Sequence, residues 1–191
     1  MMGNFSFALA ARPVEGAQVA ERSADLRARA LVTEYFDFVW RLLRRLGVPE
    51  RDVDDAAQQV FIVGAQRLRD IPFGSERTFL YGTALRTAST LRRNQRRRER
   101  FIEAASAESE ANEDTPEDAL ERRRALRFLD TVLQSLDDEE REVFVLCQIE
   151  ELSAPQVAAI VGIPVGTVAS RLRRGRQAFA EQLRRLKAQQ T

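Results

Sequence analysis

The side chains of this chain whose type and spacing best fit a chemical role are its arginines. Of the 30 basic residues 29 are Arg, and six of these lie between Leu91 and Phe101 in the stretch LRRNQRRRER. A guanidinium group donates hydrogen bonds in a planar fork that matches phosphate oxygens and guanine edges. Six like charges repel one another unless a surface of opposite charge lies against them. The run therefore predicts contact with nucleic acid.

Two aromatic residues, Phe79 and Tyr81, lie shortly before this arginine run. Aromatic rings beside cationic side chains can stack on unpaired bases, which would suit binding to a single strand. The alternative is that both rings belong to the hydrophobic core, and for Phe79 the core is the favoured interpretation.

The composition argues against catalysis. The chain contains no His, which is the side chain best suited to proton transfer near neutral pH and the commonest metal ligand. Its single Cys cannot form an internal disulfide, and Cys147 falls at an apolar position of a predicted helix, where a small core residue would lie. The sequence also has no GxxxxGK phosphate loop and no Ser–His or Cys–His pair. We therefore expect no catalytic residue, no metal site and no cofactor, and an enzyme is a remote alternative.

Helices must position these arginines. The chain has 191 residues, of which 44% are hydrophobic and 31% charged, with only 9 Gly and 6 Pro. Long charged and apolar stretches with few helix breakers predict an all-α fold. No apolar run approaches the length of a membrane-spanning helix, and no basic residue precedes Arg12 as a secretory signal would require. We expect a cytoplasmic protein without membrane insertion.

Charge divides the chain into two helical domains. Residues 99–121 hold nine acidic residues and one basic residue, and the segment 103–121 has few large apolar side chains. Such a segment cannot bury much surface, which predicts a flexible acidic linker over residues 99–117. The predicted parts of the chain are an N-terminal tail at 1–25, a first domain at 26–98, this linker, and a second domain at 118–187.

The first domain is predicted to contain three helices. Apolar residues recur three and four positions apart over 31–46, over 52–69 and over 76–98. Gly47 ends the first helix, and the sequence Ile-Pro-Phe-Gly at 71–74 separates the second from the third. The third helix would be anchored in the core by its apolar half, while its cationic tip meets phosphates.

The second domain ends in a helix-turn-helix pattern. After predicted helices over 118–134 and 138–149, Ser153 and Gln156 have the spacing of a capping box that starts a short helix. Gly162 suits its C-terminal cap, and a new helix is predicted from about Val165 or the next residue. In this motif the first turns of the second helix enter the major groove of DNA. The outward positions of that helix are Thr167, Ser170, Arg171, Arg173, Arg174 and Arg176.

These stretches resemble the extracytoplasmic-function, or group IV, sigma factors of bacterial RNA polymerase. The stretch IPVGTVASRLRRGRQAF resembles the recognition helix of region 4 in that family. The stretch DDAAQQVFIVGAQRL at 54–68 is similar to the region 2 helix that binds the clamp helices of the polymerase β′ subunit. The positions that match there are Asp55, Gln58 and Phe61.

The resemblance implies that the two domains have different tasks. Region 2 would bind core polymerase, melt the −10 promoter element and capture a flipped base. Region 4 would read the −35 element and contact the β flap. An anti-sigma factor would be a further partner, as is common in the family. The residues expected at the −10 element are Phe79, Tyr81, Arg86, Thr90, Arg93, Arg96 and Arg97.

The region 2 stretch FLYGTALRTASTLRR departs from the family pattern at three positions. Phe79 stands where the family has Trp, Arg86 where it has Asn, and Thr90 where it has Asp. The −10 sequence and the base-capture residues are therefore left open. Two other hypotheses also stay open: a free-standing helix-turn-helix regulator, and a sigma-like antagonist that binds polymerase without reading promoters.

Overall fold

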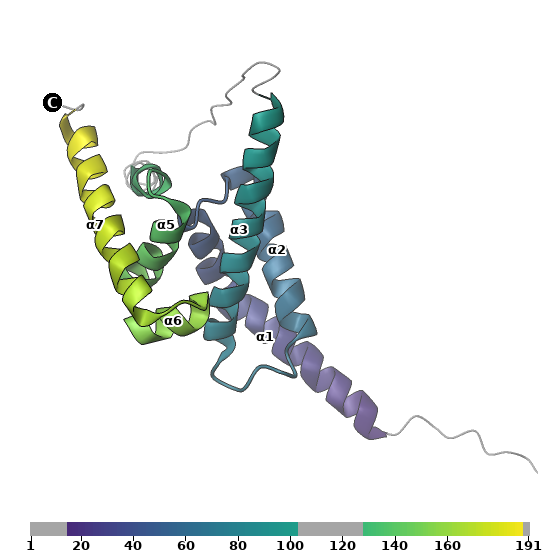
Figure 1. Ribbon diagram of the computed structural model, residues 1–191. Coiled ribbons are helices and arrows are strands. Elements are labelled where there is room, and N and C mark those ends of the chain that lie inside the picture. The colour runs from purple at the N-terminus through teal and green to yellow at the C-terminus, as the bar shows by residue number, and fades with distance from the viewer. Residues whose placement is uncertain (1–14, 103–127, 189–191) are drawn as a thin grey trace, which may run out of the picture.

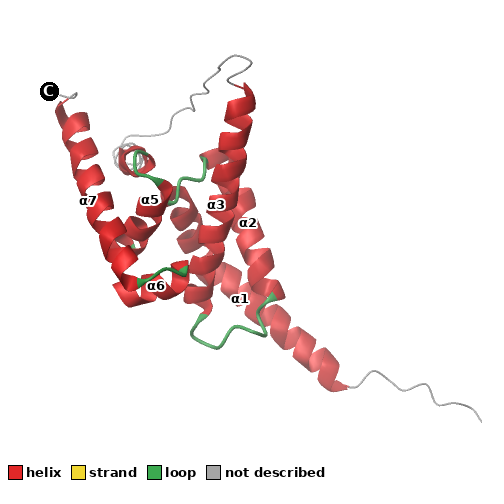
Figure 2. Cartoon of the chain, viewed as in Figure 1, coloured by secondary structure: helices red, strands yellow, loops and turns green. Residues whose placement is uncertain are grey.

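The structure is a computed structural model that describes residues 15–102 and 128–188. Every regular element in those two segments is a helix (Figure 2). This confirms the all-α fold that the composition predicts.

The first domain is a bundle of three helices that all pack against one another. Their apolar stripes meet in a core whose fully buried side chains include Leu42, Leu46, Val60 and Leu80. Deleting one such side chain would leave a cavity, so these residues fix how the helices pack. The helices are α1 (Glu15–Arg45), α2 (Glu50–Gln66) and α3 (Glu76–Ile102).

The turn between α1 and α2 requires glycine for two reasons. Gly47 has a φ of 87°, in the left-handed region that other residues rarely adopt. A side chain there would also collide with the guanidinium of Arg141, which comes from the second domain. The sequence predicts the end of the helix at Gly47, but only the structure shows this close approach.

The ends of the first domain differ from the prediction. The N-terminal tail predicted over 1–25 is wrong from Glu15 onwards, because α1 already begins there. Residues 15–25 include three Ala, two Glu, one Gln and one Arg, which are strong helix formers. The helix α3 continues to Ile102, four residues into the predicted linker. The rest of that linker, 103–117, lies outside the described residues.

The second domain is described from residue 128, so only the last part of the helix predicted over 118–134 can be compared. Residues 128–134 are helical. The helix predicted over 138–149 is present, but its last five residues wind as a π-helix, a wider form that is rare outside functional or strained positions. The elements that follow are α5 (Asp138–Phe144), the π-helix η1 (Val145–Ile149), α6 (Ala154–Val161) and α7 (Val165–Ala188).

The two domains pack against each other and share one hydrophobic core. In Figure 1, α5 and α6 lie between α7 and α3, and residues of α6 contact α3. The charge pattern predicts two domains joined by a linker, and it gives no sign of this contact. The packing decides which cationic side chains face solvent and which face the other domain.

Candidate nucleic-acid interface

The predicted helix-turn-helix is formed by α6, a short turn and α7. The backbone N–H of Ser153 donates to Oε1 of Gln156 at 2.9 Å, which is one half of the predicted capping box. Gly162 closes α6 in the left-handed conformation, with a φ of 76°. Val157 of α6 and Val168 of α7 are both fully buried, and they fix the angle at which α7 leaves the turn.

The structure divides the six predicted residues of α7 between two environments. Arg173 is exposed, and it forms no ion pair or hydrogen bond with any described residue. Arg171 instead lies against α5, where its side chain is only 15% exposed and pairs with Glu139 at 2.5 Å. The prediction that all six side chains face outward is therefore wrong for Arg171, because α7 packs against α5 along this side.

The other predicted residues of α7 lie at the edges of its exposed face. Arg174 pairs with Glu140 of α5 at 2.7 Å and stays about half exposed. Arg176 is exposed and donates to the side-chain oxygen of Gln148 at 3.0 Å. Thr167 is partly buried, and its carbonyl oxygen accepts from the Ser170 hydroxyl at 2.9 Å. The exposed face therefore presents guanidinium groups, which suit phosphates and guanine edges, and the partly buried hydroxyls of Thr167 and Ser170 lie beside it.

In α3 the structure brings five of the seven predicted −10 residues onto one face. Positions three and four apart share a face of a helix, and this face is turned away from the second domain. Most of its side chains are exposed, while Phe79 packs partly against the core as its favoured interpretation expects. The predicted residues on this outer face of α3 are Phe79, Arg86, Thr90, Arg93 and Arg97.

The other two predicted −10 residues, Tyr81 and Arg96, face the second domain. Tyr81 is 1% exposed, and its hydroxyl donates to a carboxylate oxygen of Glu150 at 3.0 Å. Burial, with the nearby Glu150 charge, raises the pKa of Tyr81 to about 12. The prediction that this ring is free to stack on bases is wrong for the packed arrangement. Arg96 pairs with Asp138 at 2.8 Å.

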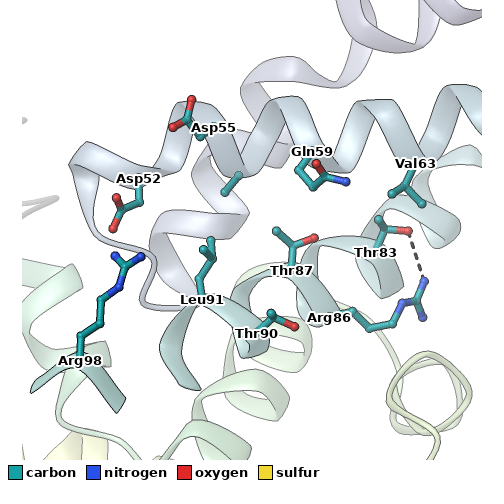
Figure 3. A pocket seen from close by; sticks show the side chains of 11 residues that line it. Asp52, Asp55, Gln59, Val63, Thr83, Arg86, Thr87, Thr90, Leu91 and Arg98 are labelled. Atoms are coloured by element: carbon teal, nitrogen blue, oxygen red, sulfur yellow. Dashed lines mark hydrogen bonds between the residues drawn. The ribbon is translucent and has the colours of Figure 1, made fainter. Parts of the chain in front are cut away.

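A groove of about 560 Å³ runs between α2 and α3 beside the outer face of α3 (Figure 3). Asp52, Asp55 and Arg98 lie at one end of it, and Arg86 lies at the other. Nη2 of Arg86 donates to the Thr83 hydroxyl at 3.3 Å, which holds the guanidinium along its own helix. The Arg86 end, lined mainly by threonine hydroxyls, is suited to a base or a phosphate, whereas the acidic end would repel phosphate.

The predicted polymerase-binding residues of α2 are also divided by the fold. Asp55 and Gln58 are exposed on α2. Phe61 is buried and stacks on Phe36 of α1, with ring centroids 6.2 Å apart. Phe61 therefore supports this surface from below, and the prediction of a direct contact does not fit its burial.

Sequence reasoning missed three exposed apolar residues beside these side chains. Val32 and Phe36 lie one turn apart on α1. Ile62 lies on α2 directly after Phe61, whose ring stacks on that of Phe36. Single exposed apolar residues are ordinary, but a group on adjacent helices indicates a protein contact. We call Val32, Phe36 and Ile62 the apolar strip. The sequence does hold a sign of the apolar strip: the apolar residues of α1 cover a wider part of the helix circumference than the part that is buried in the core.

Two other features are absent from residues 15–102 and 128–188. No group of three or more His, Cys, Asp or Glu side chains in these segments is placed to hold a metal ion. Among the same residues, no helix is long and apolar enough to span a bilayer.

Comparison with known proteins identifies both domains. Residues 31–98 match the family described as Sigma-70 region 2, and residues 126–179 match the family described as Sigma-70, region 4. The chain is 30% identical to the ECF RNA polymerase sigma factor SigW of Bacillus subtilis, over 82% of this chain and 88% of SigW. It is 32% identical to SigE of Mycolicibacterium smegmatis over 80% of this chain, but this match spans only 60% of SigE.

Two solved structures have a similar fold over most of this chain. CnrH, solved in complex with the cytosolic domain of CnrY, is 27% identical and superposes with a TM-score of 0.61, over 86% of this chain and 94% of CnrH. RpoE of Bartonella quintana, solved in complex with the anti-sigma factor NepR, covers 82% of this chain and 96% of its own with a TM-score of 0.66. At 20% identity, that second likeness shows the fold alone.

Proposed function

Because the chain belongs to the ECF group of sigma-70 family RNA polymerase sigma factors, we propose that it binds core polymerase and directs initiation at promoters whose −10 and −35 elements it reads. The observation that carries this proposal is the pair of outward cationic helix faces, one on α3 and one on α7, in two domains of one chain. The first domain, 26–98, acts at −10, and the second, 118–187, acts at −35.

In the second domain α7 is the reading helix. The partly buried Ser170 and the exposed Arg173 lie in its first turns, which are the part of such a helix that enters the major groove. Arg174 and Arg176 flank them and would bind backbone phosphates or guanine edges. The Ser170 hydroxyl donates to the backbone carbonyl oxygen of Thr167, which leaves the Thr167 hydroxyl as the polar group that this residue would offer to DNA. Arg171 holds α7 against α5 in this proposal.

In the first domain the outer face of α3 is the −10 surface. Arg93 and Arg97 are exposed cations that would follow the backbone of a separated strand. Arg86, held by Thr83 at one end of the groove, is placed to meet a base, while Thr90 offers a hydroxyl one turn further on. Phe79, partly exposed at the start of the face, is the aromatic side chain left to support stacking.

The polymerase contact uses the surface that α1 and α2 share. Asp55 and Gln58 supply polar contacts to the β′ clamp helices, and the apolar strip supplies buried area beside them. The second domain would contact the β flap. The chemistry of RNA synthesis belongs to the polymerase, so the chain itself needs no catalytic group and works in the cytoplasm with that enzyme.

A regulatory partner is a further part of the proposal. The structures of CnrH and of Bartonella quintana RpoE contain CnrY and the anti-sigma factor NepR respectively. By this likeness an anti-sigma factor would hold the present chain inactive until it is released.

In vitro transcription tests the proposal. Purified core polymerase is incubated with and without the chain on DNA from upstream of its own gene, and transcript starts are mapped. A start site that depends on the chain is the expected result. Polymerase binding without initiation would favour the sigma-like antagonist, and binding to a palindromic site without polymerase would favour the free-standing regulator.

A further inference from the structure

Two arginines on the outer face of α3 are each contacted by a threonine three residues earlier in the sequence. Nη2 of Arg86 donates to the Thr83 hydroxyl at 3.3 Å, and Nη2 of Arg93 donates to the Thr90 hydroxyl at 3.5 Å. No carboxylate of the described residues pairs with either guanidinium. Both cations are therefore available to a ligand, and they differ in what surrounds them.

The contact between Thr83 and Arg86 has a fixed direction. Thr83 is 3% exposed, and its hydroxyl donates to the backbone carbonyl oxygen of Phe79 at 3.0 Å. Since a hydroxyl has a single hydrogen, the Thr83 oxygen is left to accept from Arg86. The guanidinium also lies along the bare backbone of Gly82, where an added methyl group would be 3.4 Å from Nη1 of Arg86. Arg86 is therefore oriented before any ligand binds, whereas Thr90 is exposed and can turn its hydroxyl to water.

Arg86 lies at the end of the groove between α2 and α3, and Arg93 does not line that groove. Val63 of α2 lies across the groove from Thr83 and Thr87 of α3 (Figure 3). The methyl groups of Val63 and Thr87 offer apolar contacts to the face of a ring. The acidic far end of the groove repels phosphate. The groove therefore favours a base beside Arg86, while Arg93 is left to contact the strand backbone.

The donors of Arg86 match one base better than the others. A guanidinium only donates hydrogen bonds, so it selects a base edge that carries two adjacent acceptors. Guanine presents N7 and O6 on one edge, whereas adenine has a donating amino group beside N7. On the corresponding edge thymine presents one acceptor, O4, and cytosine presents a donor. A base of two rings also reaches further along a groove of about 560 Å³ than a pyrimidine does.

We infer that Arg86 selects guanine at one position of the bound strand, and that Thr83 is the positioning residue that holds its guanidinium for this contact. The inference rests on the proposed function, because it takes the outer face of α3 as the −10 surface. It adds the identity of a base to that surface. Arg93, in contrast, binds the strand without regard to its sequence.

The experiment compares Arg86→Ala with Arg93→Ala, two variants that lose the same charge from the same face of α3. Fluorescence anisotropy measures binding of the full chain to short oligothymidine strands with one guanine, adenine or cytosine at the centre. The unmodified chain should bind the guanine strand about tenfold tighter than the other two. Arg86→Ala should bind all three strands alike, because the paired donors are gone.

Arg93→Ala should weaken binding to all three strands by one common factor and keep the preference for guanine. Its slope of log affinity against log salt should also become shallower by about 0.7, the value for one phosphate contact on a single strand. The role of Thr83 is tested by two further variants. Thr83→Val keeps the shape of the buried side chain but removes the acceptor, so the guanine preference should fall. Thr83→Ser restores the hydroxyl and should restore the preference, with helix content unchanged by circular dichroism in both.

The inference is overturned if the unmodified chain does not prefer the guanine strand, or if the preference survives in Arg86→Ala. A loss of preference in Arg93→Ala as well would also overturn it, since general attraction would then explain both variants. Transcription with core polymerase separates these failures from that of the proposed function. Initiation by the unmodified chain without a guanine preference leaves the proposed function standing and removes only the guanine site. A guanine preference that depends on Arg86, without initiation, removes the proposed function and keeps the site.

Discussion

Gly47 and Arg141 meet at the boundary of the two domains, although 93 intervening residues separate them in the sequence. The Arg141 guanidinium lies where a side chain at Gly47 would be, and it also donates to the carbonyl oxygen of Leu46. The turn after α1 is thus part of the surface that receives the second domain. Gly47, which the sequence explains as the residue that ends a helix, is therefore also a point of contact between the two domains.

Gly47→Ala should lower the free energy of unfolding by about 3 kcal/mol, from left-handed strain of about 1 kcal/mol plus the displacement of Arg141. Gly74→Ala is the control, because Gly74 has a similar φ of 83° and no neighbouring atom lies within 4 Å of the position that an added methyl group would take. That control should lose only about 1 kcal/mol. Urea titration followed by circular dichroism measures both. Equal losses at the two positions would mean that Arg141 simply moves aside.

Arg141 also closes the helix at 128–134, which suggests a test within the second domain. Its guanidinium is buried and donates to the carbonyls of Leu133 at 2.7 Å, Gln134 at 2.8 Å and Leu136 at 2.9 Å. Arg141→Leu would leave these carbonyls without donors and should lower the free energy of unfolding by about 3 kcal/mol. Thermal unfolding of Arg176→Leu, an exposed position, gives the comparison. A loss below about 1 kcal/mol at Arg141 would show that water replaces the guanidinium.

Arg173→Ala should weaken binding to a −35 duplex about tenfold without changing stability, because this side chain is exposed and has no partner among the described residues. If Arg173 contacts a phosphate, the slope of log affinity against log salt should also become shallower by about 0.9. Arg184→Ala, exposed further along α7, is the control for lost charge. Equal weakening in both variants would point to general attraction and would remove Arg173 from the reading positions.

Ile62→Ser should lower the affinity for core polymerase by about tenfold or more, since burial of an Ile side chain stabilises a contact by about 1.5–3 kcal/mol. Ile62 is 43% exposed, so the fold should survive the change. Leu26→Ser replaces an even more exposed residue of α1 outside the apolar strip and should leave the affinity unchanged. Biolayer interferometry with immobilised core enzyme measures both. An unaffected Ile62 variant would place the polymerase contact elsewhere.

The sequence by itself determined what depends on near neighbours in the chain. The spacing of apolar residues predicts the helices, and the Ser153–Gln156 pair with Gly162 locates the turn before α7. Each of these signals acts over a few residues, where backbone hydrogen bonds and side-chain periodicity decide the conformation. The missed N-terminal half of α1 follows the same rule, because its helix propensity was present but its apolar stripe was weak.

Only the tertiary structure decided which of the predicted functional residues are free. Tyr81 and Arg96 lie on α3 with Arg93 and Arg97, yet Tyr81 is buried against Glu150, Arg96 pairs with Asp138 while 55% exposed, and Arg93 and Arg97 face solvent. Those carboxylates come from a different domain, at sequence separations that carry no periodic signal. The orientation of a helix face is fixed by whatever packs against it, and for α3 that is a domain beyond an acidic segment of the chain.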